Sequence, residues 1–203
     1  TRAERAPVAA LIGEALPMTL QLAALALAFA LAFSSLVGIA AGLRPGGLAD
    51  RFAFAVSSIF ISLPNFWLAI VLALLFSVKL GWLPAVGYGG FSYTILPAIV
   101  LAVELSPVLI RTLSGAVAAQ MGEAYVAVGR IRGLTETRIV GAHVLRNAAV
   151  PLLNLLGVQF SSLLGGVIIV EYILDYPGLG LLTINAVLQR DFPLIQGIAI
   201  VTS

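Results

Sequence analysis

The sequence contains no cysteine, one histidine and one lysine. A chain without cysteine forms no disulfide, and zinc or iron sites usually recruit several Cys or His ligands. A phosphate-binding P-loop needs Gly-Lys-Ser/Thr, whereas Lys79 lies between Val78 and Leu80. The single histidine, His143, has no Ser or Cys nucleophile in a recognisable setting, which favours a structural or interfacial role. We therefore expect no catalytic residue, no cofactor and no metal ion in this chain.

Charged residues are also scarce. They make up 10% of the sequence against 61% hydrophobic residues, and the mean hydropathy is +1.10. A soluble domain is about a quarter charged, and this chain has too little polar surface to cover a core in water. We therefore expect lipid to surround most of the chain. The net charge of +2 is too small to indicate a nucleic-acid partner.

The sequence contains several long stretches without a charged residue. A helix needs about 20 apolar residues to cross the roughly 30 Å hydrocarbon core. Uniformly apolar runs without alternation exclude a membrane β-barrel. The sequence thus predicts an all-α polytopic membrane protein with about five spans, near residues 16–43, 52–78, 93–113, 148–170 and a truncated one at 192–203.

The connections between these spans differ in charge. Residues 43–51 and 111–146 hold most of the arginines, whereas residues 171–193 contain three acids and one arginine. The positive-inside rule places the two arginine-rich connections in the cytoplasm. Residues 79–92, residues 171–193 and an amphipathic lead-in at 1–15 then lie outside. The chain begins without a methionine and ends within an apolar run, so we expect it to be part of a longer protein.

Small residues recur at a spacing of four in two of the expected spans. Gly38 and Gly42 form one pair, and Gly157, Ser161 and Gly165 extend the pattern over three turns. Small side chains let helix backbones approach closely in lipid. The pattern predicts either packing within this chain or contact with a second membrane chain.

The cytoplasmic segment 114–147 is too polar for lipid and too short for a core of its own. Good helix formers and no proline predict a helix over 114–132, and Gly133 fits the position after a helix end. Thr135 is a candidate N-cap for a second helix, and Pro151 fits the first turn of the next span. The segment serves either as an anchor for anionic lipid or as a docking helix for a cytoplasmic partner.

Two acidic residues lie near membrane depth. Glu104 is costly there, so we expect its side chain to face a cavity or to have a partner. If it lines a pathway, it would recognise a cationic group such as a peptide amine. Glu171 lies at an outer span end where we expect water to reach it, and where a structural or gating role is favoured over transport chemistry.

Several motifs resemble one protein family. The stretch EAYVAVGRIRGLTETRIVGAHVLRNAAVP (123–151) resembles the cytoplasmic EAA loop of ABC-importer permeases, in the branch for dipeptides, oligopeptides, glutathione and nickel. LPMTLQLA (16–23), LGGVIIVEYILDYPGLGLL (164–182) and RDFPLIQG (190–197) resemble the same branch. LPNFWLAIVLALLFSVKLGWLPAVGYG (63–89) is similar to the first, B-type, permease subunit of that branch.

The resemblance implies a type I importer transmembrane domain of the prokaryotic inner membrane, forming half of a translocation pathway. A coupling helix in the EAA loop would contact an ATPase subunit, and the residues implied there are Glu123, Ala124, Gly129, Arg130, Arg132, Gly133 and Leu134. Glu104 and Asn65 are the candidates for the pathway. The implied partners are a second permease subunit, two ATP-binding subunits carrying ATP and Mg, an external substrate-binding protein and membrane lipid.

Two other functions fit an apolar chain of this kind. An ion-coupled secondary transporter usually shows inverted repeats and paired intramembrane charges, whereas this sequence has no evident repeat and Glu104 is the only carboxylate within an expected span. A membrane scaffold would use the arginines of the cytoplasmic loop to bind lipid. Ligand-stimulated ATP hydrolysis by a co-purified ATPase distinguishes the permease from both.

Overall fold

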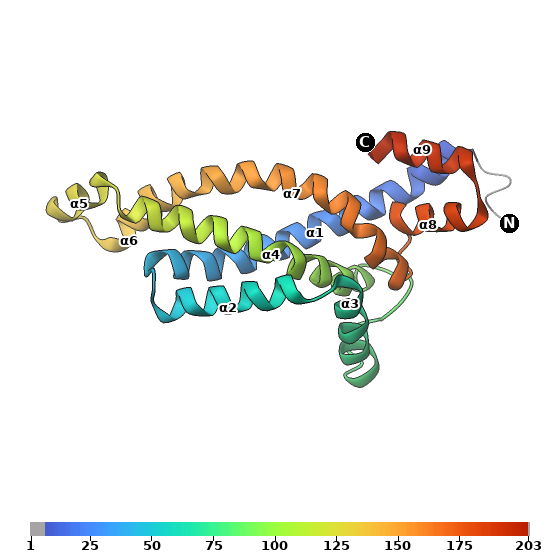
Figure 1. Cartoon of the computed structure of the whole chain (residues 1–203), viewed down its shortest axis with the longest axis horizontal. Helices are drawn as coiled ribbons and strands as arrows, with labels where there is room; N and C mark the ends of the chain where they lie inside the picture. The colour runs from blue at the N-terminus through green and yellow to red at the C-terminus, as the bar shows by residue number, and fades with distance from the viewer. Residues whose placement is uncertain (1–6, 203) are drawn as a thin grey trace. The chain divides into compact units, whose positions relative to one another are not determined.

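The computed structural model describes residues 7–202, except for the side chains of residues 164 and 165. The expected all-α fold is confirmed, because the described residues form helices and no strand (Figure 1). The expectations for residues 1–6, Gly165 and Ser203 lie outside the described part. The elements are α1 (Val8–Leu43), α2 (Leu48–Ser62), α3 (Asn65–Ala73), η2 (Leu74–Lys79), α4 (Ser92–Met121), α5 (Ala124–Ile131), α6 (Glu136–Ile139), η3 (Val140–Val144), α7 (Leu145–Ile173), α8 (Leu179–Gln189) and α9 (Phe192–Thr202).

Three helical runs in the described part are long and apolar enough to cross a membrane: Val8–Leu43, Ser92–Met121 and Glu136–Leu163. A fourth candidate is a broken pair, Leu48–Ser62 with Asn65–Lys79. The fifth expected span is represented by α9, whose 11 residues are too few to cross the bilayer by themselves.

The lead-in expected at residues 1–15 is not a separate element in its described part. Helix α1 begins at Val8 and continues without interruption to Leu43, the residue at which the first span was expected to end. Pro17 lies inside this helix. The amphipathic start and the first span therefore form one helix.

The expected span at 52–78 is wrong as a single helix. Helix α2 ends at Ser62, and Pro64 has extended backbone angles (φ −66°, ψ 134°) before α3 begins at Asn65. Proline lacks the N–H of a helical hydrogen bond and disfavours helical geometry in the residue before it. These properties account for the interruption at Leu63 and Pro64.

The chain divides into two compact units, each built from several segments. One unit comprises Ala30–Ser62 and Val103–Gln159. In it the second half of α1 packs against α4 through its glycine pair: a Cβ at Gly42 would lie 2.6 Å from the carbonyl oxygen of Ser114, and one at Gly38 would lie 3.1 Å from that of Ile110. The pair Gly38 and Gly42 thus serves packing within this chain.

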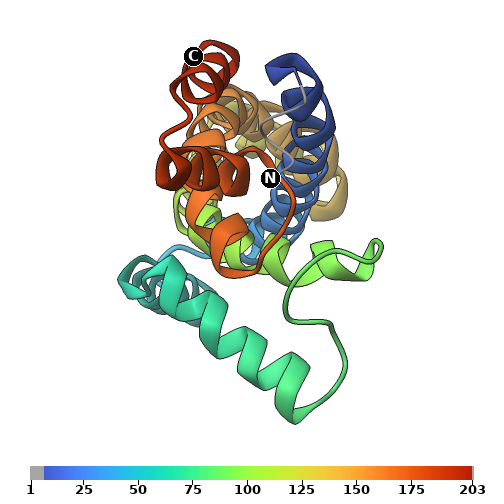
Figure 2. The same cartoon turned by 90° about the vertical axis from the view of Figure 1, so that its right-hand side faces the viewer.

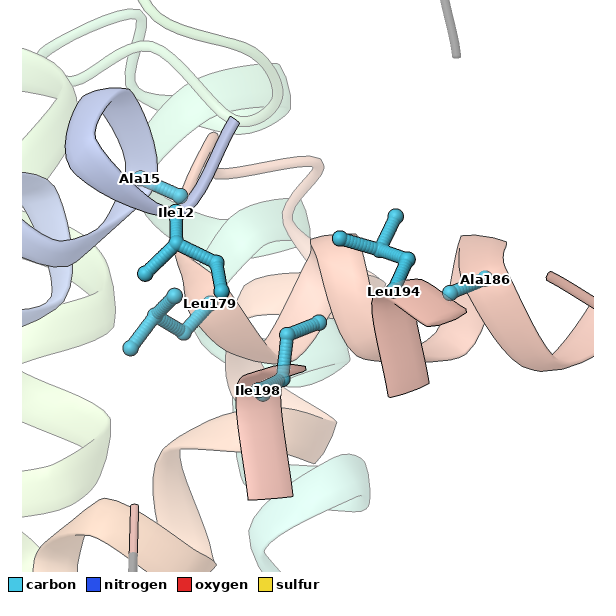
Figure 3. Packing of buried hydrophobic residues seen from close by; sticks show 6 residues of the cluster. All are labelled: Ile12, Ala15, Leu179, Ala186, Leu194 and Ile198. Atoms are coloured by element: carbon cyan, nitrogen blue, oxygen red, sulfur yellow. The ribbon is translucent and has the colours of Figure 1, made fainter. Parts of the chain in front are cut away.

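The other unit comprises Thr1–Phe29, Leu63–Ala102 and Phe160–Ser203. Its start of α1 lies beside α8 and α9 (Figure 2). Figure 3 shows the apolar residues between these three helices, namely Ile12, Ala15, Leu179, Ala186, Leu194 and Ile198. Helix α8 lies within residues 171–193, which the sequence predicted only as an outer connection.

Residues 114–147, which the sequence predicted to be cytoplasmic, also differ from expectation at their helix boundaries. Helix α4 continues past residue 113 to Met121, and a break at Gly122 and Glu123 separates it from α5, so the single helix predicted for 114–132 is wrong. Beyond α5, the chain is helical from α6 through the π-helical turn η3 into α7. Pro151 consequently lies inside α7 rather than in its first turn.

Candidate functional site

The candidate site is the connection between α4 and α7, which contains α5 and α6 (yellow in Figure 1). Helix α5 ends in the manner the sequence predicted. The N–H of Gly133 donates to the carbonyl oxygen of Arg130 at 3.0 Å, and the N–H of Leu134 donates to that of Gly129 at 3.0 Å. Gly133 has φ +75°, which glycine adopts without the steric cost of a Cβ. Residues Arg132 to Thr135 therefore form a defined turn between α5 and α6.

Thr135 occupies the N-cap position of α6, with extended backbone angles (φ −67°, ψ 146°). The predicted N-cap position is therefore confirmed, although the Thr135 side chain makes no capping hydrogen bond. The Oγ1 atom instead lies 3.2 Å from that of Thr137. The sequence thus predicted the position of Thr135 at the helix start but not the partner of its hydroxyl.

Gly129 is buried against the following helix. A Cβ at this position would lie 3.3 Å from Cδ1 and Cγ1 of Ile139 and 3.7 Å from Cδ1 of Leu134. Val126 and Ile139 are each 1% exposed. These apolar contacts hold α5 against the last residue of α6, and only a very small residue fits at position 129.

An ion pair joins the two helices on their exposed side. Nε of Arg130 donates to Oε1 of Glu136 at 2.6 Å, and Nη2 donates to Oε2 at 3.2 Å. The hydrogen bond, and then the negative charge, of Glu136 raise the pKa of the Arg130 guanidinium above its ordinary value. Both side chains are about half exposed or more (49% and 58%), so solvent screens the pair and its contribution to stability is small. The sequence prediction included Arg130 but not its partner Glu136.

Two apolar residues of α5 that were not among the predicted coupling residues are exposed. Ile131 is 85% exposed and Val128 is 45% exposed, although both are large and apolar. Glu123, Ala124 and Arg132 are exposed as well. Helix α5 thus presents a mixed apolar and charged surface that nothing in this chain covers among the described residues.

Tyr125 connects α5 to its neighbours. Its hydroxyl donates to Oε1 of Gln120 at 2.8 Å, and its ring lies 6.3 Å from that of His143. Both rings line a cavity of about 240 Å³, which Arg132 and Asn147 also line. His143 therefore has an aromatic neighbour in the loop, and the sequence did not reveal Tyr125 as that neighbour.

The two candidate pathway residues lie on different helices. Glu104 is on α4 with an exposed side chain, in the unit that contains Val103–Gln159. Asn65 is the first residue of α3, directly after the break at Pro64, and is partly exposed. A role in transport stays a prediction for each of them.

Glu171 forms a second polar cluster that the sequence described incorrectly. Its side chain is fully buried rather than open to water. Oε1 accepts a hydrogen bond from the Thr19 hydroxyl at 2.7 Å, and Oε2 accepts from the N–H of Gly180 at 2.6 Å. Thr19 precedes Glu171 by 152 residues. No local sequence signal identifies such a distant partner.

Tyr176, expected to belong to a simple connection, is also fully buried. Its hydroxyl lies 3.3 Å from Oγ1 of Thr94 and donates to the carbonyl oxygen of Met18 at 3.4 Å. Its ring contacts that of Tyr88 edge to face, with 5.6 Å between the centroids. The turn after α7 is therefore anchored to two other helices, α1 and α4.

Comparisons with known proteins support the resemblance seen in the sequence. The family described as binding-protein-dependent transport system inner membrane component matches residues 34–203 of the chain. A putative peptide transport system permease protein of Brucella abortus (strain 2308) is 36% identical over 199 residues, covering 94% of this chain and 63% of that protein. The glutathione transport system permease protein GsiC of Escherichia coli (strain K12) is 37% identical over 192 residues, covering 95% and 63% respectively. The chain thus spans less than two thirds of the length of these curated relatives.

Solved structures show the same fold at lower identity. A chain of the MetNI methionine ABC transporter in an inward-facing conformation matches with a TM-score of 0.78 and 20% identity, covering 94% of this chain and 87% of that chain. A chain of an amino acid ABC transporter with histidines matches with a TM-score of 0.69 and 18% identity, covering 96% and 86% respectively.

Proposed function

Because this chain belongs to the family of binding-protein-dependent transport system inner membrane components, we propose that it acts as the permease subunit of an ATP-driven importer. The chain then forms half of a translocation pathway through the inner membrane. It performs no covalent chemistry of its own. ATP and Mg are bound by separate ATPase subunits, because the only lysine in this sequence is outside any P-loop motif.

The surface of α5 is the observation that carries this proposal. The helix is held on its inner side by Gly129 and Ile139 and leaves Ile131 exposed on its outer side. An apolar residue at this exposure, next to charged neighbours, fits a cleft in a partner protein. Closure of two ATPase subunits would move α5 as a rigid lever and shift the ends of α4 and α7.

The coupling residues act in two ways in this proposal. Glu123 and Arg132 offer charges for hydrogen-bonded ion pairs with the ATPase subunit. Ala124 and Gly129 have small side chains that allow neighbouring groups to approach α5 closely. Gly133 and Leu134 fix the turn at the end of α5. Arg130 is paired with Glu136, which orients its guanidinium at the surface of α5.

The other proposed partners follow from the family resemblance and from surfaces left open. A second permease subunit completes the pathway, and the small residues of α7 support this: Gly157 is exposed, and apart from the neighbouring backbone of its own helix no atom lies within 4 Å of the position of a Cβ. An external substrate-binding protein delivers the solute at the side where α7 ends. Anionic lipid surrounds the arginine-rich cytoplasmic connections.

The solute we propose is a peptide or a related small molecule. The names of two relatives, a peptide permease and a glutathione permease, support this class. We place Glu104 and Asn65 along the pathway, where the carboxylate would pair with a cationic group such as a peptide amine and the amide would donate to or accept from the peptide backbone.

Co-purification of the full-length permease with its ATPase subunit tests the proposal. We compare Ile131→Asp on α5 with Leu48→Asp at the start of α2, because both residues are 85% exposed. An unpaired charge in an apolar cleft should lower the amount of bound ATPase roughly tenfold or more for Ile131→Asp. Leu48→Asp should leave it unchanged.

Uptake into liposomes then separates the alternatives. A permease subunit requires ATP and the external binding protein for uptake. Uptake driven by a proton or sodium gradient without nucleotide would identify a secondary transporter instead. A protein that binds anionic lipid through 111–146 but neither retains an ATPase nor transports would be a scaffold.

A further inference from the structure

A cavity of about 180 Å³ lies between α2 and α4, in the unit that contains α2. Its walls carry two opposite charges, Asp50 and Arg111, and the hydroxyls of Ser57 and Ser114. Pockets for small-molecule ligands usually measure about 300–1,000 Å³. This cavity is therefore of a size for one polar group rather than for a whole solute.

The two charges lie where the expected spans reach the membrane surface. Asp50 comes two residues before the expected span at 52–78, and Arg111 comes two residues before the end of the expected span at 93–113. The positive-inside rule places both of these span ends on the same, cytoplasmic side. The cavity is thus expected at the depth of the lipid head groups.

An aromatic ring orients the guanidinium of Arg111 at this cavity. Cζ of Arg111 lies over the ring of Phe54 on α2, 5.4 Å from the ring centroid. A guanidinium that lies on a ring face keeps the N–H donors of its edge available to an acceptor. Phosphate oxygens match this fork of donors through paired, charge-assisted hydrogen bonds.

The carboxylate of Asp50 provides the opposite charge at a fixed place. Its Oδ2 atom accepts a hydrogen bond from the N–H of Gly46 at 2.8 Å, which holds the side chain at the start of α2. A carboxylate has about four acceptor positions, so this one retains capacity for a cationic donor. A carboxylate repels a simple anion, whereas the combination of Asp50 with Arg111 matches a ligand that carries both charges.

Ser57 adds an unsatisfied polar group to the wall of the cavity. The residue is fully buried, and its hydroxyl has no hydrogen-bond partner in the part of the chain that the structure describes. A buried hydroxyl without a partner is unfavourable, and each such group calls for an explanation. A polar ligand in the cavity supplies the missing partner once the hydroxyl rotates toward it.

Exposed apolar side chains continue from the cavity toward the middle of the expected spans. Phe54 is 65% exposed, and Ile61, seven residues later on the same face of α2, is 62% exposed. Val108 on α4, three residues before Arg111, is 43% exposed. A ligand with its charges in the cavity can therefore lay hydrocarbon chains along both helices.

We propose that this cavity binds the head group of a phospholipid with a primary amine, of the phosphatidylethanolamine class. Arg111 binds the phosphate, Asp50 binds the ammonium group, and the acyl chains lie along Phe54 and Ile61. Phosphatidylcholine fits less well because its trimethylated ammonium has no N–H donor, and phosphatidylglycerol fits less well because it has no cation. The site is independent of the proposed transport function, since it requires only that the chain lies in a membrane.

Lipid retention tests the site. The full-length permease, with any subunits that co-purify, is incubated in detergent with each of the three lipids bearing identical acyl chains, and bound lipid is measured by mass spectrometry. Phosphatidylethanolamine should be retained in preference to the other two. Arg111→Gln should lower its affinity roughly tenfold through loss of a hydrogen bond to a charged group. Arg51→Gln is the matched control, because Arg51 is an exposed residue of α2 outside the cavity lining, and it should retain the lipid.

The ammonium contact has a readout of its own. Asp50→Asn should abolish the preference for phosphatidylethanolamine over phosphatidylcholine, whereas a purely structural role of Asp50 would lower thermal stability and leave that preference intact. Equal binding of phosphatidylcholine, or tighter binding of phosphatidylglycerol, by the unchanged protein would overturn the proposal. So would an equal loss in Arg51→Gln and Arg111→Gln, or binding that disappears when other subunits co-purify, because a protein then covers the cavity.

A covalent test locates the bound lipid. A carbodiimide joins a carboxylate to a primary amine that touches it, forming an amide while the reagent takes up the water released. With phosphatidylethanolamine bound, the lipid should become attached to the peptide that contains Asp50, as seen by mass spectrometry after proteolysis. Asp50→Asn and phosphatidylcholine should each give no product there. Attachment only to other carboxylates would show that the amine lies elsewhere and would overturn the proposal.

Discussion

The hydroxyl of Ser57 is fully buried in α2 and has no hydrogen-bond partner. An unsatisfied buried hydroxyl is unfavourable by about 1–3 kcal/mol. We therefore expect Ser57→Ala to raise the free energy of unfolding by about 1 kcal/mol, measured by thermal unfolding in detergent micelles. Ser34 provides a matched comparison, since it is equally buried and donates to the carbonyl oxygen of Ser106 at 3.3 Å. Ser34→Ala should not stabilise the protein, and a gain equal to that of Ser57→Ala would contradict the explanation.

Gly42 and Gly115 are helical glycines of the same unit, but Gly42 is closely packed and Gly115 is not. A Cβ at Gly42 would lie 2.6 Å from Ser114 O and Val117 Cβ, whereas nothing lies within 4 Å of one at Gly115. Gly42→Ala should destabilise this unit, since the backbones of α1 and α4 must separate. Gly115→Ala should stabilise it by about 0.5–1 kcal/mol, because alanine has the higher helix propensity. Thermal unfolding of both variants checks the contrast, and an equal response would argue against close packing at Gly42.

Residues whose surroundings are local in sequence were the predictable ones. Gly133 was correctly placed after a helix end, because the helix pattern before it and Leu134 after it are adjacent. Glu171 was placed in contact with water, because its position at a span end is visible in the sequence while its partners Thr19 and Gly180 are not. Burial of a polar group depends on contacts that only the folded chain defines.

The turn between α5 and α6 depends on a single backbone conformation. Gly133 has φ +75°, which an alanine adopts only at a cost of about 1 kcal/mol. Gly133→Ala should therefore loosen the end of α5, seen as faster exchange of the amide hydrogens of Arg132 and Leu134, which donate to the carbonyl oxygens of Val128 and Gly129, than in the unchanged protein. Gly141→Ala is the control, since Gly141 has no atom within 4 Å of its Cβ position and no positive φ. Equal exchange in both variants would remove the turn as the determinant of this helix end.

Helix boundaries were the least predictable feature at this scale. Pro17 and Pro151 lie inside α1 and α7, yet Pro64 marks the break between α2 and α3. Hydropathy alone describes 52–78 as one apolar run, and proline is tolerated in membrane helices where neighbours satisfy the freed backbone groups. Whether a proline interrupts a helix is thus decided by tertiary packing, which the sequence pattern does not contain.

For the proposed importer as a whole, Glu104 is the sharpest test of the proposed pathway. Glu104→Gln keeps the shape of the side chain and removes its charge, so uptake kinetics of a cationic solute should change while the complex still assembles. Uptake into liposomes with the full set of subunits measures this. Glu14→Gln is a control with the same change at an exposed acid of α1. Unchanged kinetics for Glu104→Gln would remove Glu104 from the pathway.

Fold class and family were within reach of the sequence because they depend on composition and on motifs that are continuous in the chain. Uncharged stretches indicated membrane helices, and EAYVAVGRIRGLTETRIVGAHVLRNAAVP indicated the loop that folds into α5 and α6. The contacts of Ile139 with Gly129, and the helix α8 within an expected connection, required the structure. The contact and the position of α8 depend on which apolar residues pack together. In a chain with so many apolar residues, the sequence does not distinguish one packing partner from another.

The π-helical turn η3, Val140–Val144, lies between α6 and α7. A π-helical turn accommodates one residue more than an α-helical one, and each residue of an α-helix rotates the chain by about 100°. Conversion of this turn from π-helical to α-helical geometry would therefore rotate α6 about the helix axis relative to the start of α7. If α5 binds an ATPase subunit as we propose, a rotation imposed on α5 would then reach α7 as rotation of a helix.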